Sequence, residues 1–337
     1  MQSINEGYFL VTCSNLIFEV KGGVHPSDRF IAYVRYVPDK EGNRTGLRGN
    51  KYKKIYSLSK RNQYLHDNYS KFLWFDRHSN RVVQAVPLSE IESVLDPVDT
   101  LKQLRDMKRG LSELQQKTIE LSTVLVGSSG IPWSAIGVTG SQLVDLATEE
   151  SDIDLVVYGE DECRRLYQSL EQIYMNHQGL EKYDGEILQQ HTEFRWNRNS
   201  PCWNWLLTVE RRKLLQGIYH ETEFFLRCVR NRSENTLGYD EYEYKFLGEE
   251  TVESVVTDDS QGIFTPCEYT VECDMIPNLK KLVSFRGRFT EHVQVGDHIR
   301  AAGRLEAVWK DGKEKYLQLV LGEKPSDYLV PMSCLDD

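Results

Sequence analysis

The sequence has no apolar run that approaches the ~20 residues needed to span a bilayer, and its first residues lack the basic and apolar regions of a signal peptide. Its seven cysteines are scattered and never spaced as C-x-x-C. This pattern argues against a disulfide framework and against a zinc ribbon. No internal repeat or low-complexity tract interrupts the 337 residues. These absences predict a cytoplasmic globular protein without a membrane partner.

Charge is unevenly distributed along the chain. The formal net charge is −10, yet residues 1–95 contain 14 Lys or Arg and 9 Asp or Glu, a net of +5 (14 − 9). The remainder therefore carries −15. Such asymmetry indicates that the amino-terminal part meets an anionic partner.

Composition and periodicity divide the chain into three predicted domains. Residues 1–95 contain short aromatic and β-branched runs bounded by Gly, Pro, Asp and Asn, which predict a β-rich domain that contacts nucleic acid. Residues 96–238 alternate between strand and helix patterns and predict an α/β (α+β) domain with a mixed sheet. Residues 239–337 contain several short strands separated by turn signals, which predict a small antiparallel barrel of the OB type.

The middle segment predicts a specific order of elements. A single long helix is expected after Pro97, because Leu101, Leu104, Met107 and later leucines recur at helical spacing. The elements expected after it are a strand at Ser134–Val138, a short helix at Ser141–Ala147, a strand at Asp152–Tyr158, a helix at 161–176 and a strand at Glu221–Val229. In the last segment the expected strands are Thr251–Val256, Cys267–Glu272, Leu282–Phe289, His298–Val308 and Tyr316–Leu321.

One group of residues in the middle segment has the pattern of a metal- and phosphate-binding site. Gly140 and Ser141 follow a predicted strand, and ten residues separate Ser141 from Asp152, which is followed by Asp154. Alternate side chains share one face of a strand, so the two carboxylates point the same way and repel each other unless a cation lies between them. Oxygen ligands of this kind suit Mg²⁺ or Mn²⁺. Glycine permits close backbone approach, and a serine at the start of a helix can donate to phosphate.

The Gly140-Ser141 and Asp152-x-Asp154 pattern resembles the signature of the DNA polymerase β-like nucleotidyltransferases. The whole chain is similar to a group of uncharacterised prokaryotic predicted nucleotidyltransferases, through His25-Pro26-Ser27-Asp28-Arg29 and Ser284-Phe285-Arg286-Gly287-Arg288, among other blocks. The resemblance implies in-line attack by an acceptor hydroxyl, of RNA or protein, on the α-phosphorus of an NTP, with release of pyrophosphate.

The resemblance also implies a third carboxylate on a later strand. Glu223 is the candidate, and Glu221, expected on the same strand face, is the reserve. Asp152, Asp154 and Glu223 would hold the metal, and Glu223 would accept a proton. Gly140 and Ser141 are expected to bind nucleotide phosphate. Arg211, Arg212 and Lys213 are expected to add cations for it, although a solvated helix face remains the alternative.

One departure from the family pattern keeps a second hypothesis open. Many members have a basic residue soon after Gly-Ser, whereas this chain has Gln142-Leu143-Val144. The missing cation weakens the expected phosphate site. The alternative is a catalytically weak or inactive RNA-binding protein that retains the nucleotidyltransferase fold.

The segment 40–61 is the most basic part of the chain. It contains eight Lys or Arg against one acid, Glu41, with tyrosines between them. Cations with aromatics are typical of single-stranded nucleic acid binding. Lys51, Lys53, Lys54 and Tyr52 are therefore candidate contacts to an RNA acceptor, and a solvated hairpin tip is the alternative.

Overall fold

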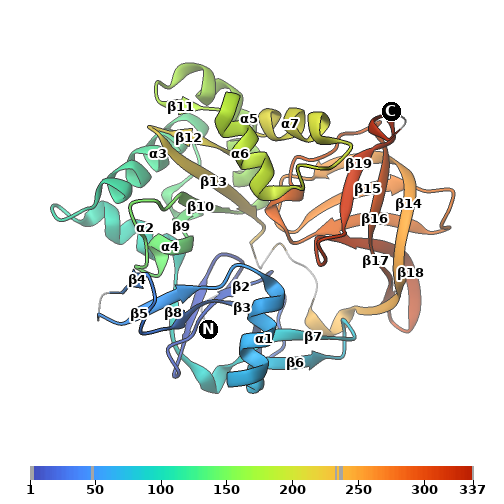
Figure 1. Cartoon of the computed structure of the whole chain (residues 1–337), viewed down its shortest axis with the longest axis horizontal. Coiled ribbons are helices and arrows are strands. Elements are labelled where there is room, and N and C mark those ends of the chain that lie inside the picture. The colour runs from blue at the N-terminus through green and yellow to red at the C-terminus, as the bar shows by residue number, and fades with distance from the viewer. Residues whose placement is uncertain (1–3, 47–48, 232–233, 235–237, 336–337) are drawn as a thin grey trace. The chain divides into compact units, whose positions relative to one another are not determined.

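A computed structural model describes residues 4–46, 49–231, 234 and 238–335, and the chain divides into two compact units (Figure 1). The first unit comprises residues 1–76, 81–180 and 219–239, and the second comprises 77–80, 181–218 and 240–337. The predicted amino-terminal segment and most of the predicted α/β segment thus lie in one unit. Residues 181–218 belong with the carboxy-terminal segment instead.

An eight-stranded sheet, here called the amino-terminal sheet, forms the first part of the first unit. Its strands pair in the order β4-β5-β3-β2-β1-β8, and β7 pairs with both β3 and β6. Side chains along the long strand β3 alternate between buried and half-buried, as expected for a strand with one face against a core. The strands are β1 (Phe9–Thr12), β2 (Ile17–Val20), β3 (Arg29–Pro38), β4 (Arg44–Thr45), β5 (Lys51–Lys54), β6 (Leu73–Asp76), β7 (Arg81–Pro87) and β8 (Ile91–Leu95). A helix that the sequence pattern did not suggest, α1 (Leu58–Asn68), follows β5, and the 3₁₀ turns η1 (Ser70–Phe72) and η2 (Leu88–Glu90) flank β6 and β7.

A mixed sheet, here called the central sheet, forms the second part of the first unit. The strand β10 (Ile153–Tyr158) pairs in parallel with β13 (Thr222–Val229) and antiparallel with β9 (Ile136–Val138). The short strands β11 (Leu180–Glu181) and β12 (Gln216–Tyr219), where the chain passes between the units, extend the order to β11-β12-β13-β10-β9. The helix α4 (Gly140–Leu143) follows β9, and α5 (Glu160–Asn176) follows β10 and packs on α3. This arrangement confirms the predicted mixed α/β architecture.

The long helix predicted after Pro97 is instead two helices. The first, α2 (Pro97–Asp106), begins at Asp96, whose carboxylate accepts from Val98 N at 2.8 Å. The second, α3 (Glu113–Ser129), begins with a capping box between Ser112 and Gln115. The first helix ends at Met107, whose backbone is extended (φ −70°, ψ 123°), and Gly110 adopts a left-handed φ of +85° in the connection to the second. The helical spacing of leucines continues across the break, which explains why periodicity alone merged the two. A 3₁₀ turn, η3 (Trp133–Ala135), connects α3 to β9.

The amino-terminal and central sheets share one hydrophobic core. Val156, Tyr158 and Val229 of the central sheet belong to the same buried cluster as Leu10, Phe18 and other apolar residues of the amino-terminal sheet. Two buried hydrogen bonds reinforce the contact. Thr139 Oγ1 donates to Gly7 O at 2.6 Å, and Tyr158 OH donates to Glu6 O at 2.9 Å.

Ion pairs between two buried carboxylates and three half-buried cations also join the two sheets. This buried ion cluster consists of Glu6, Glu19, Lys21, Arg35 and Arg227. Arg227, on β13, contacts Glu6 at 2.9 Å and Glu19 at 2.7 Å, and Lys21 contacts the same two carboxylates at 2.9 and 2.8 Å. Arg35 contacts Glu19 at 3.1 Å. Burial alone would raise the pKa of Glu19, but Lys21, Arg35 and Arg227 together hold that pKa well below its usual value.

The second unit combines two helices with six strands. The helices are α6 (Gly185–Arg195) and α7 (Trp203–Arg212). The strands are β14 (Glu243–Gln261), β15 (Cys267–Glu272), β16 (Leu279–Ser284), β17 (His298–Lys310), β18 (Lys313–Leu321) and β19 (Tyr328–Pro331). They pair in the order β14-β15-β16-β18-β17-β19, and β14 pairs with β17 as well. β16 and β18 are parallel, whereas only antiparallel pairs were predicted. The 3₁₀ turn η4 (Tyr239–Glu241) precedes β14, η5 (Gly287–Phe289) follows β16 and η6 (Met332–Cys334) follows β19.

The core of the second unit surrounds a buried carboxylate. Glu210 of α7 accepts from Lys213 Nζ at 2.9 Å and from Trp196 Nε1 at 2.8 Å. Trp196 and Trp205 pack against the apolar cluster of the strands, as expected for core tryptophans rather than base-stacking ones. Lys213 is therefore a structural ion-pair partner inside this unit.

A disulfide joins Cys202 to Cys334 within the second unit. The scattered cysteines argued against a disulfide framework, and this one disulfide is the exception that the pattern missed. The separation of 132 residues leaves no local signal, because only the fold brings the start of α7 to the carboxy-terminal turn. Among the described residues, no helix is both long enough and apolar enough to cross a membrane.

We expect Arg227→Met to destabilise the first unit by about 3–5 kcal/mol, because it removes the ion pairs that the buried carboxylates of Glu6 and Glu19 form with Arg227. Urea unfolding monitored by circular dichroism measures the change. Arg165→Met is the matched control, since Arg165 forms a more exposed pair with Glu162, and such pairs contribute about 0–1 kcal/mol. Equal losses in the two variants would contradict a structural role for the cluster.

We expect Cys202→Ser together with Cys334→Ser to lower the free energy of unfolding of the second unit by about 2–4 kcal/mol, because the disulfide restricts a long loop of the unfolded chain. Guanidinium unfolding with and without a reducing agent measures the effect. Cys273→Ser, at a free and half-buried thiol, should leave the midpoint unchanged. Seven free thiols in the denatured, unreduced protein would show that the disulfide does not form.

Candidate active site

Asp152 and Asp154 lie at the start of β10, on the face that the amino-terminal sheet covers. Asp152 is exposed and Asp154 is half-buried, while Ile153 and Leu155 between and after them are fully buried on the opposite face. Strand alternation therefore brings the two carboxylates together as the sequence predicted.

Gly140 lies against the carboxylate of Asp154. Its backbone has φ +66°, and a Cβ built on it would be 2.0 Å from Asp154 Oδ2. The neighbouring Thr139 N also donates to Asp154 O at 2.9 Å, which holds the two segments together. Only glycine satisfies both the left-handed conformation and the close approach. The spacing of Gly-Ser and Asp-x-Asp in the sequence therefore corresponds to a direct contact in the fold.

Ser141 and Gln142 have different surroundings. The Ser141 hydroxyl is buried, and it has no hydrogen-bond partner among the residues that the structure describes. An unpaired buried hydroxyl is costly unless a ligand satisfies it. The helix α4 has only four residues, shorter than the expected Ser141–Ala147, so its dipole adds little to anion binding.

The side chain of Gln142 points away from the Ser141 hydroxyl and toward α3. Its Nε2 donates to Thr118 Oγ1 at 2.8 Å. The residue after Gly-Ser thus faces the core. The absence of a basic side chain at this position therefore removes no phosphate contact from the site.

The charges around Asp154 set its electrostatic state. Burial, followed by the charge of Asp152, raises the pKa of Asp154 to about 7. Arg227, Lys54 and Arg35 pull that pKa in the opposite direction. Two neighbouring carboxylates, one with so high a pKa, form an arrangement that a divalent cation would relieve.

Glu223 leaves β13 on the same face as the aspartates. Ile153 is in parallel register with Phe224, so Asp152 and Glu223, each one residue earlier, point to one side of the sheet. Glu223 is exposed. Within the described part of the chain, no three His, Cys, Asp or Glu side chains converge as metal ligands.

Glu221, the reserve candidate, does not lie on the strand. His220 and Glu221 have φ of +44° and +67°, so they form the turn that precedes β13. Strand parity therefore cannot be applied to Glu221, and Glu223 remains the candidate that shares a face with the aspartates.

The predicted basic residues of α7 belong to the second unit, and each is engaged there. Arg211 forms an exposed ion pair with Asp184 at 2.8 Å. Arg212 donates to His292 O at 2.8 Å and to Gln294 Oε1 at 2.8 Å. Lys213 is buried against Glu210. The structure thus gives Arg212 and Lys213 roles in the packing of α7 against the segment between β16 and β17.

The basic hairpin β4–β5 has two different faces. Tyr52 is buried against Leu143 and Leu146, next to the Gly-Ser segment, while Lys51 and Lys53 point out to solvent on the opposite face. Tyr52 is thus a core residue rather than an exposed stacking platform. Lys54 shares the face of Tyr52, and its charge acts on Asp154. Arg48, another cation of this segment, lies outside the described residues.

Residues 133–216 match the nucleotidyltransferase domain family, which confirms the resemblance drawn from Gly140, Ser141 and the aspartate pair. The chain carries a nucleotidyltransferase domain. It is also 29% identical, over 93% of its own length and 94% of the relative's, to an uncharacterised protein of Methanocaldococcus jannaschii. No solved structure matches the chain. The nucleotidyltransferase match includes Gly140 and both aspartates, and it leaves out Glu223 and the whole amino-terminal sheet.

Sequence reasoning missed several residues that surround the carboxylates of the nucleotidyltransferase domain. Arg227 follows Glu223 by four residues on one strand, so strand parity could have placed it on the same face. Glu6, in the turn before β1, and Glu19 and Arg35, on β2 and β3, are distant in sequence, and no local pattern links them to Asp154.

We expect Gly140→Ala to destabilise the protein more than Gly130→Ala by about 1–3 kcal/mol, because only the first introduces an overlap with Asp154. Gly130 is a matched control, since it has φ +68° and open space around it. Denaturant unfolding measures both. In a double-mutant cycle, we expect Gly140→Ala to lower the free energy of unfolding by about 0.5–3 kcal/mol less in the Asp154→Ala background than in the wild-type background. Additive effects would show that the two residues do not touch.

Proposed function

We propose that the protein transfers a nucleoside monophosphate from an NTP to a hydroxyl acceptor, an RNA or a protein, and releases pyrophosphate. The observation that carries this proposal is the contact of Gly140 with the Asp154 carboxylate, beside the unpaired hydroxyl of Ser141. The nucleotidyltransferase domain match includes all three residues. Together they provide a metal ligand and a hydrogen-bond donor for phosphate within one short segment of the fold.

Each residue has a role in the proposed reaction. The acceptor oxygen bonds to the α-phosphorus as the bond from that phosphorus to the pyrophosphate oxygen breaks. Asp152, Asp154 and Glu223 would hold Mg²⁺ or Mn²⁺, which supplies positive charge to the triphosphate and lowers the pKa of the attacking hydroxyl. Glu223 accepts the hydroxyl proton. Ser141 Oγ donates to a phosphate oxygen, and Gly140 leaves room for it.

A second candidate is an RNA-binding protein that has kept the nucleotidyltransferase fold without activity. It is favoured by one observation, that no three carboxylates converge as metal ligands among the described residues. The orientation of Gln142 removes the earlier argument for this candidate, because position 142 faces α3.

We further infer that β14 to β18 form an OB-like small barrel. The pairing of β14 with both β15 and β17 supports this inference. Small barrels of this type often bind oligonucleotides, which would suit an RNA acceptor, although fold alone does not establish function.

We expect wild-type protein with Mg²⁺ to incorporate label from at least one α-labelled NTP into total RNA or cell protein. Asp152→Asn and Asp154→Asn should each reduce incorporation by about 100-fold or more, because each removes charge that holds the metal. Gel autoradiography of each reaction measures the label. Glu223→Gln should also lose activity, whereas Glu221→Gln, in the turn, should retain it.

The control for this experiment is Asp161→Asn, at an exposed acid in the first turn of α5. It should leave incorporation at the wild-type level. Absence of label with wild type in every reaction, or equal label in wild type and Asp154→Asn, would overturn the enzymatic proposal and favour the RNA-binding candidate.

A further inference from the structure

Lys54 is set apart from its neighbours by the alternation of strand β5. Tyr52 and Lys54 share one face, and Lys51 and Lys53 share the other. The Tyr52 face packs on Leu143 and Leu146, which lie within the segment between Ser141 and Asp152. Lys54 is also the register partner of Tyr36 on β3. The amino-terminal sheet therefore presents Lys54, and not Lys53, to the nucleotidyltransferase site.

The Lys54 ammonium has no ion pair or hydrogen bond within the part of the chain that the structure describes. Its one recorded contact is with the ring of Tyr56, whose centroid is 5.0 Å away. The side chain is half-buried, and its charge is felt at Asp154. The other two cations that act on Asp154, Arg35 and Arg227, are held by carboxylates of the buried ion cluster. Lys54 is thus a cation whose charge acts on Asp154 and which is available to a ligand.

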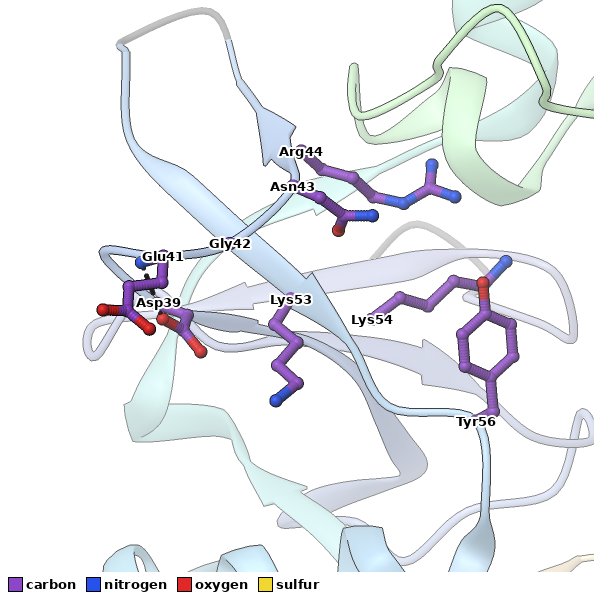
Figure 2. Close-up of a pocket in the computed structure, with 8 residues that line it drawn as sticks. All are labelled: Asp39, Glu41, Gly42, Asn43, Arg44, Lys53, Lys54 and Tyr56. Carbon is purple, nitrogen blue, oxygen red and sulfur yellow. Dashed lines mark hydrogen bonds between the residues drawn. The ribbon is translucent and has the colours of Figure 1, made fainter.

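A pocket of about 340 Å³ opens next to Lys54. Its lining includes Lys53 and the two acids Asp39 and Glu41 as well as Asn43, Arg44 and Tyr56, and Figure 2 shows Lys54 extending toward Tyr56 while Lys53 points away from that ring. Arg44 Nη1 donates to Leu146 O at 2.6 Å, so this residue ties the hairpin to the loop that leads to Asp152. A volume of this size lies at the lower end of the range for small-ligand sites, about 300–1,000 Å³.

We propose that Lys54 binds the phosphate oxygens of the NTP, so that the amino-terminal sheet completes the nucleotide site. The inference rests on the proposed function and names a binding residue outside the matched nucleotidyltransferase segment. A triphosphate beside Asp152 and Asp154 needs positive charge, and Lys54 is the available cation at that place. Lys51, on the solvent face and outside the pocket lining, is not placed to reach it.

The test is equilibrium binding of non-hydrolysable α,β-methylene analogues of ATP, GTP, CTP and UTP to the full-length protein with Mg²⁺, measured by calorimetry. We expect Lys54→Gln to weaken the binding of the preferred analogue by tenfold or more. The corresponding nucleoside should bind both proteins equally weakly. Lys51→Gln, on the same strand, on the opposite face and outside the pocket lining, should bind like wild type. Lys54→Arg should restore most of the affinity, which separates a charge effect from a folding defect.

Three results would overturn the inference. Unchanged analogue binding by Lys54→Gln overturns it alone, as does a loss of RNA binding without a loss of analogue binding. Failure of the wild-type protein to bind any of the four analogues overturns the proposed function as well. Circular dichroism and unfolding of each variant confirm that the comparison is between folded proteins.

Discussion

The buried ion cluster is the constraint on which the rest of the first unit depends. Glu6 and Glu19 have exposed fractions of 0% and 3%, and carboxylates so buried stay charged only if cations face them. Arg227 supplies one cation from the central sheet, while Lys21 and Arg35 supply others from the amino-terminal sheet. Arg227 thus links the strand beside the aspartates to buried carboxylates of the amino-terminal part, within one unit.

The same cluster pairs with two of the three cations that act on Asp154, and so leaves only the third able to bind a ligand. Arg35 and Arg227 act on that carboxylate through space, but their guanidinium groups are already bound by Glu19 and Glu6. They contribute a fixed positive background that limits the rise in the pKa of Asp154. Lys54 has no such partner among the described residues. The division between bound and free cations distinguishes residues that shape the site from one that can contact a substrate.

The parts of the structure that the sequence predicted are those with local causes. Alternation placed Asp152 and Asp154 on one face of β10, and the apolar run after them defined the strand. The break between α2 and α3 was missed because the leucine spacing continues across Gly110. The disulfide between Cys202 and Cys334 was missed because 132 residues separate its ends. The contacts of Glu6 and Glu19 with Arg227 likewise depend on how distant strands pack, which periodicity does not encode.

In the basic hairpin, the sequence predicts which side chains share a face, and the tertiary packing decides which face is turned inward. Strand alternation requires that Lys53 and Lys54 point in opposite directions, and this could be stated from the sequence. Which of the two faces the carboxylates depends on Tyr52, because its burial against Leu143 and Leu146 fixes the inner face of β5. The count of positive charges therefore suggested one uniform nucleic-acid surface. The packing of a single tyrosine divides it into an outer face open to solvent and an inner lysine beside Asp154.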